Sequence, residues 1–235
     1  MEDYIRINKF VATNGTLARR KVDEYILQGR ITVNGITIRE PGYKINPGKD
    51  SVSVDGEPIK VEKKNIYIVL NKPPKVISAV TDNKKRKTVV DLVKAKDRIF
   101  PIGRLDYETT GLIILTNDGE LANKLMHPRY KVDKTYLVHL SKPLQEKHKK
   151  KLTEGIFIDR KKTEPAKILF LNKDDFKRLF ISIHEGRNRQ VRNMFEILGY
   201  NIRKLHRTKY GNLKLGDLGE GEWRKLSGKE IALLK

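Results

Sequence analysis

The chain has no cysteine among its 235 residues, and this absence excludes several classes of protein. Without thiols it cannot be a disulfide-stabilised scaffold, hold zinc through thiolates or use a cysteine nucleophile. It also has no apolar run of about 18 residues, the length that a membrane-spanning helix needs, and its acidic start is unlike a signal peptide. The five histidines lack the spacing of metal ligands. We therefore expect a cytoplasmic protein, with no membrane segment and no metal site.

Acidic residues are scarce relative to basic ones. Fifty Lys and Arg stand against 29 Asp and Glu, so the formal net charge is +21. A hydrophobic fraction of 38% is too high for a disordered basic tail, and the length suffices for one large or two modest domains. A folded chain with this charge favours a polyanionic partner, above all a nucleic acid.

The excess charge lies almost entirely after residue 62. Residues 1–62 carry 10 basic and 9 acidic side chains, which leaves +20 for residues 63–235. The basic residues of this second part gather in five clusters: Lys84–Lys87, Lys147–Lys151, Arg160–Lys162, Arg187–Arg192 and Arg203–Lys209. Because few acidic residues accompany them, we expect a continuous basic surface on the second part.

The first part has the pattern of a small α+β unit. Apolar spacing over residues 5–28 predicts two short helices. The pair Asn34-Gly35 between β-branched alternations predicts a hairpin, and a further strand follows at residues 51–54. A charged linker at residues 62–65 closes the unit, which makes the two parts two domains.

The second part mixes strands and helices without a regular repeat. Residues 66–70 and 112–115 are continuous apolar runs, as central strands buried on both faces require. Periodicity predicts further strands at 135–140, 166–171 and 178–184, and helices at 121–126 and 190–198. This mixture predicts an α+β domain built on a mostly antiparallel mixed β-sheet with flanking helices. We expect Trp223 to anchor its core.

Cations stand at a helix–strand corner of the first part. Arg19, Arg20 and Lys21 fall on an early helix turn, and Arg30 precedes the hairpin. Helix amide groups and fixed guanidinium groups together suit RNA phosphates. Over nearly all of residues 5–56 the chain resembles the S-four RNA-binding domain, through Arg6-Ile7-Asn8-Lys9-Phe10, Ala18-Arg19-Arg20-Lys21, Gly29-Arg30 and Val33-Asn34-Gly35. This resemblance implies binding of structured RNA and leaves open what is done to it.

The second part contains a longer motif around Asp106. Gly103-Arg104-Leu105-Asp106 precedes Thr110-Gly111-Leu112-Ile113-Ile114-Leu115-Thr116-Asn117-Asp118-Gly119. An aspartate in a loop just before a buried strand is held rigidly and stays open to a ligand. This string resembles the signature of the RsuA/RluB-type pseudouridine synthases. Matches at Asn71-Lys72-Pro73, Lys134-Thr135-Tyr136 and Glu185-Gly186-Arg187-Asn188-Arg189-Gln190-Val191-Arg192 extend the resemblance along almost the entire chain.

The resemblance implies roles for individual residues. Asp106 falls at the family's catalytic aspartate, Tyr136 at its active-site aromatic, and Arg192 at the basic residue that pairs with the aspartate. The residues implied to contact the substrate are Arg104, Arg187, Arg189 and Val191, the last of them against the uracil ring. In the S-four domain, Arg19, Arg20, Lys21 and Arg30 are expected to contact RNA.

The implied reaction explains these residue types. Pseudouridylation breaks the bond from the uracil nitrogen to the sugar, turns the base and rejoins it through carbon 5, so neither cofactor nor metal is required. An ionised carboxylate can act as nucleophile or base, and a neighbouring guanidinium favours the ionised form. Attack of Asp106 on the base, attack on the anomeric carbon and removal of a ribose proton all stay open. A base inside a helix must first be flipped out.

The form of residues 186–192 favours one substrate class. Many relatives have His where Arg189 stands and Arg where Asn193 stands, and the sequence here is closer to members that act on large-subunit ribosomal RNA. We therefore expect a monomeric enzyme that isomerises uridine in a structured stem-loop of that RNA. Small-subunit RNA stays open as the alternative substrate.

Two readings from other classes compete with the synthase. The first is a non-catalytic RNA-binding or ribosome-assembly protein, which would have no need of Asp106, Tyr136 and Arg192 together. The second is a methyltransferase or tRNA synthetase that carries the same small N-terminal domain. The chain lacks the Gly-x-Gly-x-x-Gly loop of a nucleotide-binding methyltransferase, which counts against that reading.

Overall fold

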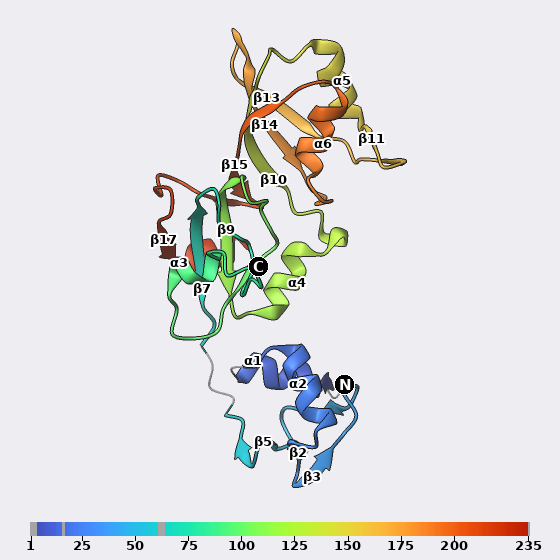
Figure 1. The fold of residues 1–235 in the computed structure, drawn as a ribbon, viewed down its shortest axis with the longest axis vertical. Helices are drawn as coiled ribbons and strands as arrows, with labels where there is room; N and C mark the ends of the chain where they lie inside the picture. The colour runs from blue at the N-terminus through green and yellow to red at the C-terminus, as the bar shows by residue number, and fades with distance from the viewer. Residues whose placement is uncertain (1–3, 16, 61–63, 235) are drawn as a thin grey trace. The chain divides into compact units, whose positions relative to one another are not determined.

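The computed structural model describes residues 4–15, 17–60 and 64–234, and the chain divides into two compact units, Met1–Asn65 and Ile66–Lys235. Both units combine helices with sheet, as the sequence predicts (Figure 1). Among the described helices, none is long and apolar enough to cross a membrane.

The first unit packs a helix pair against a small sheet. Its elements are β1 (Ile5–Arg6), α1 (Ile7–Asn14), α2 (Arg19–Leu27), β2 (Ile31–Val33), β3 (Ile36–Ile38), β4 (Lys44–Ile45), β5 (Val52–Val54) and β6 (Glu57–Pro58). Strands run in the order β3-β2-β5-β6, and β1 pairs with β4. Asn34 and Gly35 both have positive φ, 51° and 81°, as the tight turn between β2 and β3 requires. The predicted helix pair and hairpin are confirmed.

The second unit is built on one large sheet. Its strands are β7 (Tyr67–Lys72), β8 (Phe100–Ile102), β9 (Thr110–Thr116), β10 (Lys134–Leu140), β11 (Phe157–Ile158), β12 (Lys161–Lys162), β13 (Lys167–Asn172), β14 (Asp175–Ile183), β15 (Ile202–Tyr210), β16 (Leu213–Lys214) and β17 (Trp223–Lys225). Its helices are α3 (Val89–Val93), α4 (Gly119–Met126), the 3-10 turn Pro128–Tyr130, α5 (Glu146–Glu154), α6 (Gln190–Ile197) and α7 (Gly228–Ala232).

The strand order makes this a mixed sheet. It runs β13-β14-β10-β15-β9-β7-β17, with β16 beside β15 and β8 beside β9, while β11 and β12 form a separate hairpin. β15 and β9 pair in parallel, and the other pairings of the sheet are antiparallel. The predicted mostly antiparallel mixed sheet is confirmed.

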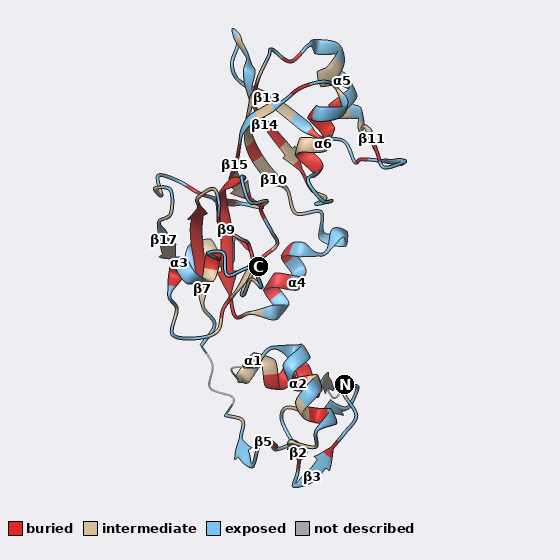
Figure 2. Ribbon diagram, in the orientation of Figure 1, coloured by how far each residue is buried: buried red, intermediate tan, exposed pale blue. Residues whose placement is uncertain are grey.

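The central strands β7 and β9 are buried along their whole length (Figure 2). Alternate side chains enter two separate cores, since Ile68 and Leu70 belong to one and Val69 to the other. Helices α3, α5 and α6 cover the first core, and α4 and α7 cover the second. Burial on both faces is what the continuous apolar runs predict.

Two expectations for the second unit need correction. Trp223 is 41% exposed on β17, the strand at the end of the sheet, so it does not anchor the core. The basic cluster Arg203–Lys209 does not form a uniform charged surface, because it lies within β15 and alternate residues of a strand face opposite ways. Leu205 and Arg207 are consequently buried.

Candidate active site

A cavity of about 620 Å³ lies in the second unit and collects every residue that the sequence singles out there. Its lining includes Arg104, Asp106, Tyr136, Arg187, Arg189, Val191 and Arg192. They come from the loop between β8 and β9, from β10, from the loop that leads into α6, and from the first turn of α6. Folding thus brings together motifs that lie far apart in the chain.

The loop that carries Asp106 is held on both sides by hydrogen bonds. The Ser78 hydroxyl donates to the Leu105 carbonyl (2.9 Å) and accepts from the Leu105 amide (3.1 Å). On the other side the Lys72 ammonium donates to the Tyr107 carbonyl (3.3 Å). The Asp106 side chain itself keeps 35% of its surface exposed. The loop therefore presents a fixed carboxylate to the cavity.

Arg192 is the cation that faces this carboxylate. Its Nε lies 4.0 Å from Asp106 Oδ2, and its Nη2 lies 3.3 Å from the Thr109 hydroxyl. Burial and the nearby Arg189 lower the pKa of Arg192, while Asp106 raises it. Arg192 Nε is buried and has no hydrogen-bond partner among the described residues. The pair is therefore loose, and the carboxylate is left accessible to a ligand.

Tyr136 is 8% exposed on β10 and lies beside a buried cation. Its ring centroid is 6.0 Å from Cζ of Arg207, which also lies 5.0 Å from the ring centroid of Tyr210. Burial raises the pKa of Tyr210 to about 12, so this phenol is neutral and donates to the Leu125 carbonyl (3.0 Å). The two rings and the guanidinium all line the cavity.

The Arg187 guanidinium is held by hydrogen bonds to other residues of the chain. Its Nη1 and Nη2 donate to the carbonyls of Lys161 and Lys162 (2.8 and 2.5 Å), and its Nε donates to Glu185 (3.2 Å). These bonds attach the β11–β12 hairpin to the loop before α6. An RNA contact through this guanidinium would therefore compete with bonds that hold the cavity wall.

The remaining predicted contacts of the second unit differ in exposure. Arg104 and Arg189 are exposed at the cavity, and Arg189 begins α6 with a positive φ of 47° and lies 3.5 Å from Glu196. Val191 is 3% exposed and belongs to the core under α6. Arg104 and Arg189 therefore present their charges to solvent beside the cavity, whereas Val191 offers an apolar wall.

In the first unit, the Arg19-Arg20-Lys21 triplet forms the first turn of α2. Arg19 Nη2 donates to Asn8 Oδ1 (3.1 Å), and Lys21 lies 2.6 Å from Glu24. Arg20 is exposed, and no ion pair is seen for it within the part of the chain that the structure describes. The triplet is a solvated basic turn, as an RNA-binding role requires.

Arg30 is the most constrained cation of that unit. It makes two hydrogen bonds to Asp55 (2.7 and 2.6 Å), and its Cζ lies 3.6 Å from the centroid of the Tyr25 ring. The bonded guanidinium lowers the pKa of Asp55. Arg30 thus presents a fixed orientation at the corner between α2 and the hairpin.

Sequence reasoning assigned no site role to several residues of the cavity, among them Lys134, Arg207 and Tyr210. Arg207 was expected only as part of a charged cluster, yet it is 2% exposed. The usable signal was Leu205 two residues before it, because alternate residues of a strand share a face. Among the described residues, no group of three or more His, Asp or Glu could hold a metal ion.

Comparison with known proteins identifies the family. A family model for RNA pseudouridylate synthase matches residues 66–197, and a model for the S4 domain matches residues 5–51. The chain belongs to the RNA pseudouridylate synthase family. The predicted family, its N-terminal S-four domain and its enzyme class are thereby confirmed.

Relatives of this synthase match over nearly its full length. It is 46% identical to the ribosomal large subunit pseudouridine synthase B of Bacillus subtilis (strain 168), over 98% of this chain and 95% of the relative. It is 38% identical to the dual-specificity RNA pseudouridine synthase RluF of Escherichia coli (strain K12), over 97% and 77%. A crystal structure of a pseudouridylate synthase superposes with a TM-score of 0.71 at 32% identity, covering 98% of this chain and 100% of that one.

Proposed function

We propose that this synthase isomerises a uridine of large-subunit ribosomal RNA, with Asp106 as the carboxylate that acts on the target nucleotide. The meeting of Asp106, Tyr136 and Arg192 at one cavity carries the proposal. The cavity's volume of about 620 Å³ falls in the ~300–1,000 Å³ range of sites that enclose a small ligand. The name of the Bacillus subtilis relative supports the large-subunit assignment.

The geometry suits a base that has left its helix. A flipped uridine enters the cavity, where Val191 offers an apolar surface and Tyr136 a flat one. Arg192 offers a positive charge beside the Asp106 carboxylate, and the 4.0 Å gap leaves a carboxylate oxygen available to the nucleotide. We assign to the Tyr136 hydroxyl the removal of the proton from carbon 5.

RNA binding outside the cavity is proposed for the exposed cations. Arg104 and Arg189 meet the strand beside the flipped base, and the α2 turn with Arg20 contacts structured RNA through the S-four domain. Phosphate contacts of this kind set affinity and register. We propose that the protein works as a cytoplasmic monomer, and the lining of the cavity from one chain supports the monomer.

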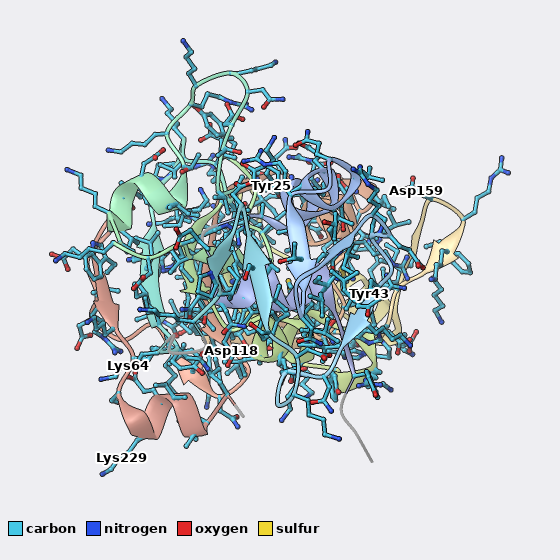
Figure 3. All side chains as sticks on the ribbon, turned by 90° about the horizontal axis from the view of Figure 1, so that it is seen from below. Tyr25, Tyr43, Lys64, Asp118, Asp159 and Lys229 are labelled. Carbon is cyan, nitrogen blue, oxygen red and sulfur yellow. The ribbon has the colours of Figure 1, made fainter. Side chains whose placement is uncertain are left out.

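The test is tritium release from ribosomal RNA labelled at carbon 5 of uridine. We expect wild type to release tritium from the large-subunit transcript, and Asp106→Asn to lower the rate by about 10³-fold or more. RNA affinity should stay within a few-fold, because one charge changes among many. Asp159→Asn is the matched control, since Asp159 lies in the exposed turn between β11 and β12, where its positive φ of 49° suits Asn (Figure 3).

Each other outcome overturns a part of the proposal. Equal loss of RNA binding and activity in Asp106→Asn would make Asp106 a structural residue. Release from the small-subunit transcript alone would move the substrate to that RNA. No release by wild type from free transcripts or from ribosomal particles would favour the RNA-binding or assembly role.

A further inference from the structure

Four side chains form a cross-strand cluster on one wall of the cavity. On β10, Lys134 and Tyr136 are two residues apart and therefore point to the same face. On β15, Tyr210 pairs with Lys134 and Arg207 pairs with Tyr136. Each of the two pairs thus joins one cation to one aromatic ring, and all four side chains line the cavity.

A β-bulge is what completes this cluster. Thr135 pairs with Lys209 and Tyr136 with Arg207, so Thr208 is an extra residue on β15. In a regular strand, Tyr210 would point to the face opposite Arg207, because the two are three residues apart and side chains alternate. The Thr208 hydroxyl donates to the Thr135 carbonyl (3.3 Å), which fixes the bulge.

The cluster holds positive charge without a carboxylate. Arg207 is 2% exposed, and its Nε donates to the Leu112 carbonyl (2.7 Å), while Nη2 is buried with no hydrogen-bond partner among the described residues. Lys134 Nζ donates to the His184 carbonyl (3.2 Å) and lies 5.6 Å from the centroid of the Tyr210 ring. No salt bridge joins either cation to an acidic residue within residues 4–15, 17–60 and 64–234.

Two such cations beside one cavity need a partner that the chain does not provide. A buried charge is costly unless it is paired, and the cost rises where a second charge of the same sign lies near. Burial, and after it the neighbouring Arg207, lower the pKa of Lys134, while Asp133 and Glu185 act in the opposite direction. These two carboxylates are paired with Lys167 and Arg187 instead. A uracil carbonyl is neutral and would not offset two cations, whereas a phosphodiester carries the missing negative charge.

We propose that Lys134 and Arg207 form a subsite that binds the backbone phosphate next to the target uridine. The inference rests on the proposed function, because it assigns a further part of the same nucleotide to the same cavity. It also gives the phosphate a task in the reaction. Once the bond between uracil and sugar is broken, the base has to turn while the sugar stays in place. A phosphate anchored on β10 and β15 holds the sugar without restricting the base.

The experiment is phosphate-ethylation interference on the RNA that wild type modifies. Ethylation turns a single phosphodiester into a neutral triester, and RNA molecules that still bind are separated from those that do not. We expect strong interference by wild type at a phosphate flanking the pseudouridine mapped in the same transcript. In Lys134→Gln and Arg207→Gln that interference should disappear while interference at other phosphates persists. The rate of tritium release should fall about tenfold or more in both variants.

Controls separate the subsite from general charge and from folding. Lys229→Gln removes one positive charge from an exposed lysine of α7 that does not line the cavity (Figure 3), and it should leave the wild-type interference pattern and rate unchanged. Lys134→Gln keeps the test decisive if Arg207→Gln, which also loses the bond to Leu112, fails to fold. Thermal melting identifies such a failure.

A second readout does not depend on turnover. Inorganic phosphate should raise the melting temperature of wild type and Lys229→Gln above that in chloride of equal ionic strength, and Lys134→Gln should lose this difference. Interference and phosphate stabilisation that persist in Lys134→Gln would overturn the subsite. If wild type forms no pseudouridine but the phosphate effect is lost in Lys134→Gln, the anion subsite stands and the proposed function fails.

Discussion

Lys72 is a buried cation at the end of β7. It is fully buried, and its ammonium donates to the Pro73 carbonyl (2.9 Å) and the Tyr107 carbonyl (3.3 Å). Burial lowers its pKa to about 8, although Glu108 and Asp106 act in the opposite direction. The charged form is therefore kept at a cost in stability, and its hydrogen bond holds the residue that follows Asp106.

This depressed pKa predicts how stability depends on pH. Between about pH 8 and the ordinary lysine pKa of 10.5, the unfolded chain binds more protons at Lys72 than the folded chain does. The free energy of unfolding should therefore gain a favourable contribution as pH rises through this window. We expect urea unfolding to show this gain in wild type relative to Lys72→Met, and we expect Lys229→Gln to behave as wild type. A difference between wild type and Lys72→Met that does not change from pH 7 to 10.5 would contradict the prediction.

At the scale of elements, the contact between β9 and β15 connects the two halves of the sheet. The two strands run parallel here, with His206 opposite Thr110 and Arg207 opposite Gly111. Gly111 has a φ of 107°, and a Cβ atom there would lie 2.3 Å from the Arg207 carbonyl oxygen. A glycine is therefore required where the strand that follows the Asp106 loop meets the strand that carries Arg207.

Replacing Gly111 should break this junction. We expect Gly111→Ala to lower the free energy of unfolding by about 3 kcal/mol or more, because the positive φ and the backbone clash act together. Gly119→Ala is the matched control, since that residue lies in the first turn of α4 and a Cβ atom there meets nothing within 4 Å. Chemical denaturation of both variants measures the difference. Equal free energies of unfolding in the two variants would show that the contact between β9 and β15 does not require a glycine at position 111.

At the scale of the whole molecule, the two units have cores of their own. The core of the first contains Ile7, Phe10 and Val22, while β7 and β9 are central to the cores of the second. The charge is also divided unevenly between the units, since nearly all of the excess positive charge lies in the second unit. The proposed catalytic residues all lie there as well, and we expect the first unit to select the RNA.

Removal of residues 1–62 tests this division. We expect the shortened chain to lose discrimination between its target RNA and a transcript of equal length, while the single-turnover rate on bound RNA changes by only a few-fold. General affinity should fall less than selectivity, because the removed segment carries a net charge of only +1. Competition binding and single-turnover tritium release are the measurements, with circular dichroism to show that the second unit is folded. Unchanged selectivity would remove the recognition role from the S-four domain.

Much of the fold could be predicted because its signals are local. The apolar runs of β7 and β9 identify strands buried on both faces, and Asn34-Gly35 identifies a hairpin. The motif residues of the cavity could be named from the resemblance, and the structure places all of them in one lining. The position of Trp223 could not be predicted, because exposure of an edge strand depends on what packs beside it.

The sequence by itself determined the family, the hairpin, the central strands and the motif residues at the cavity, because motifs and periodicity are properties of neighbouring positions. Only the tertiary structure decided which side chains meet across β10 and β15. The extra residue Thr208 shifts the alternation of β15, so Arg207 and Tyr210 lie on the same face although they are three residues apart. A pattern read along one strand cannot contain such a pairing, because the register depends on hydrogen bonds to another strand.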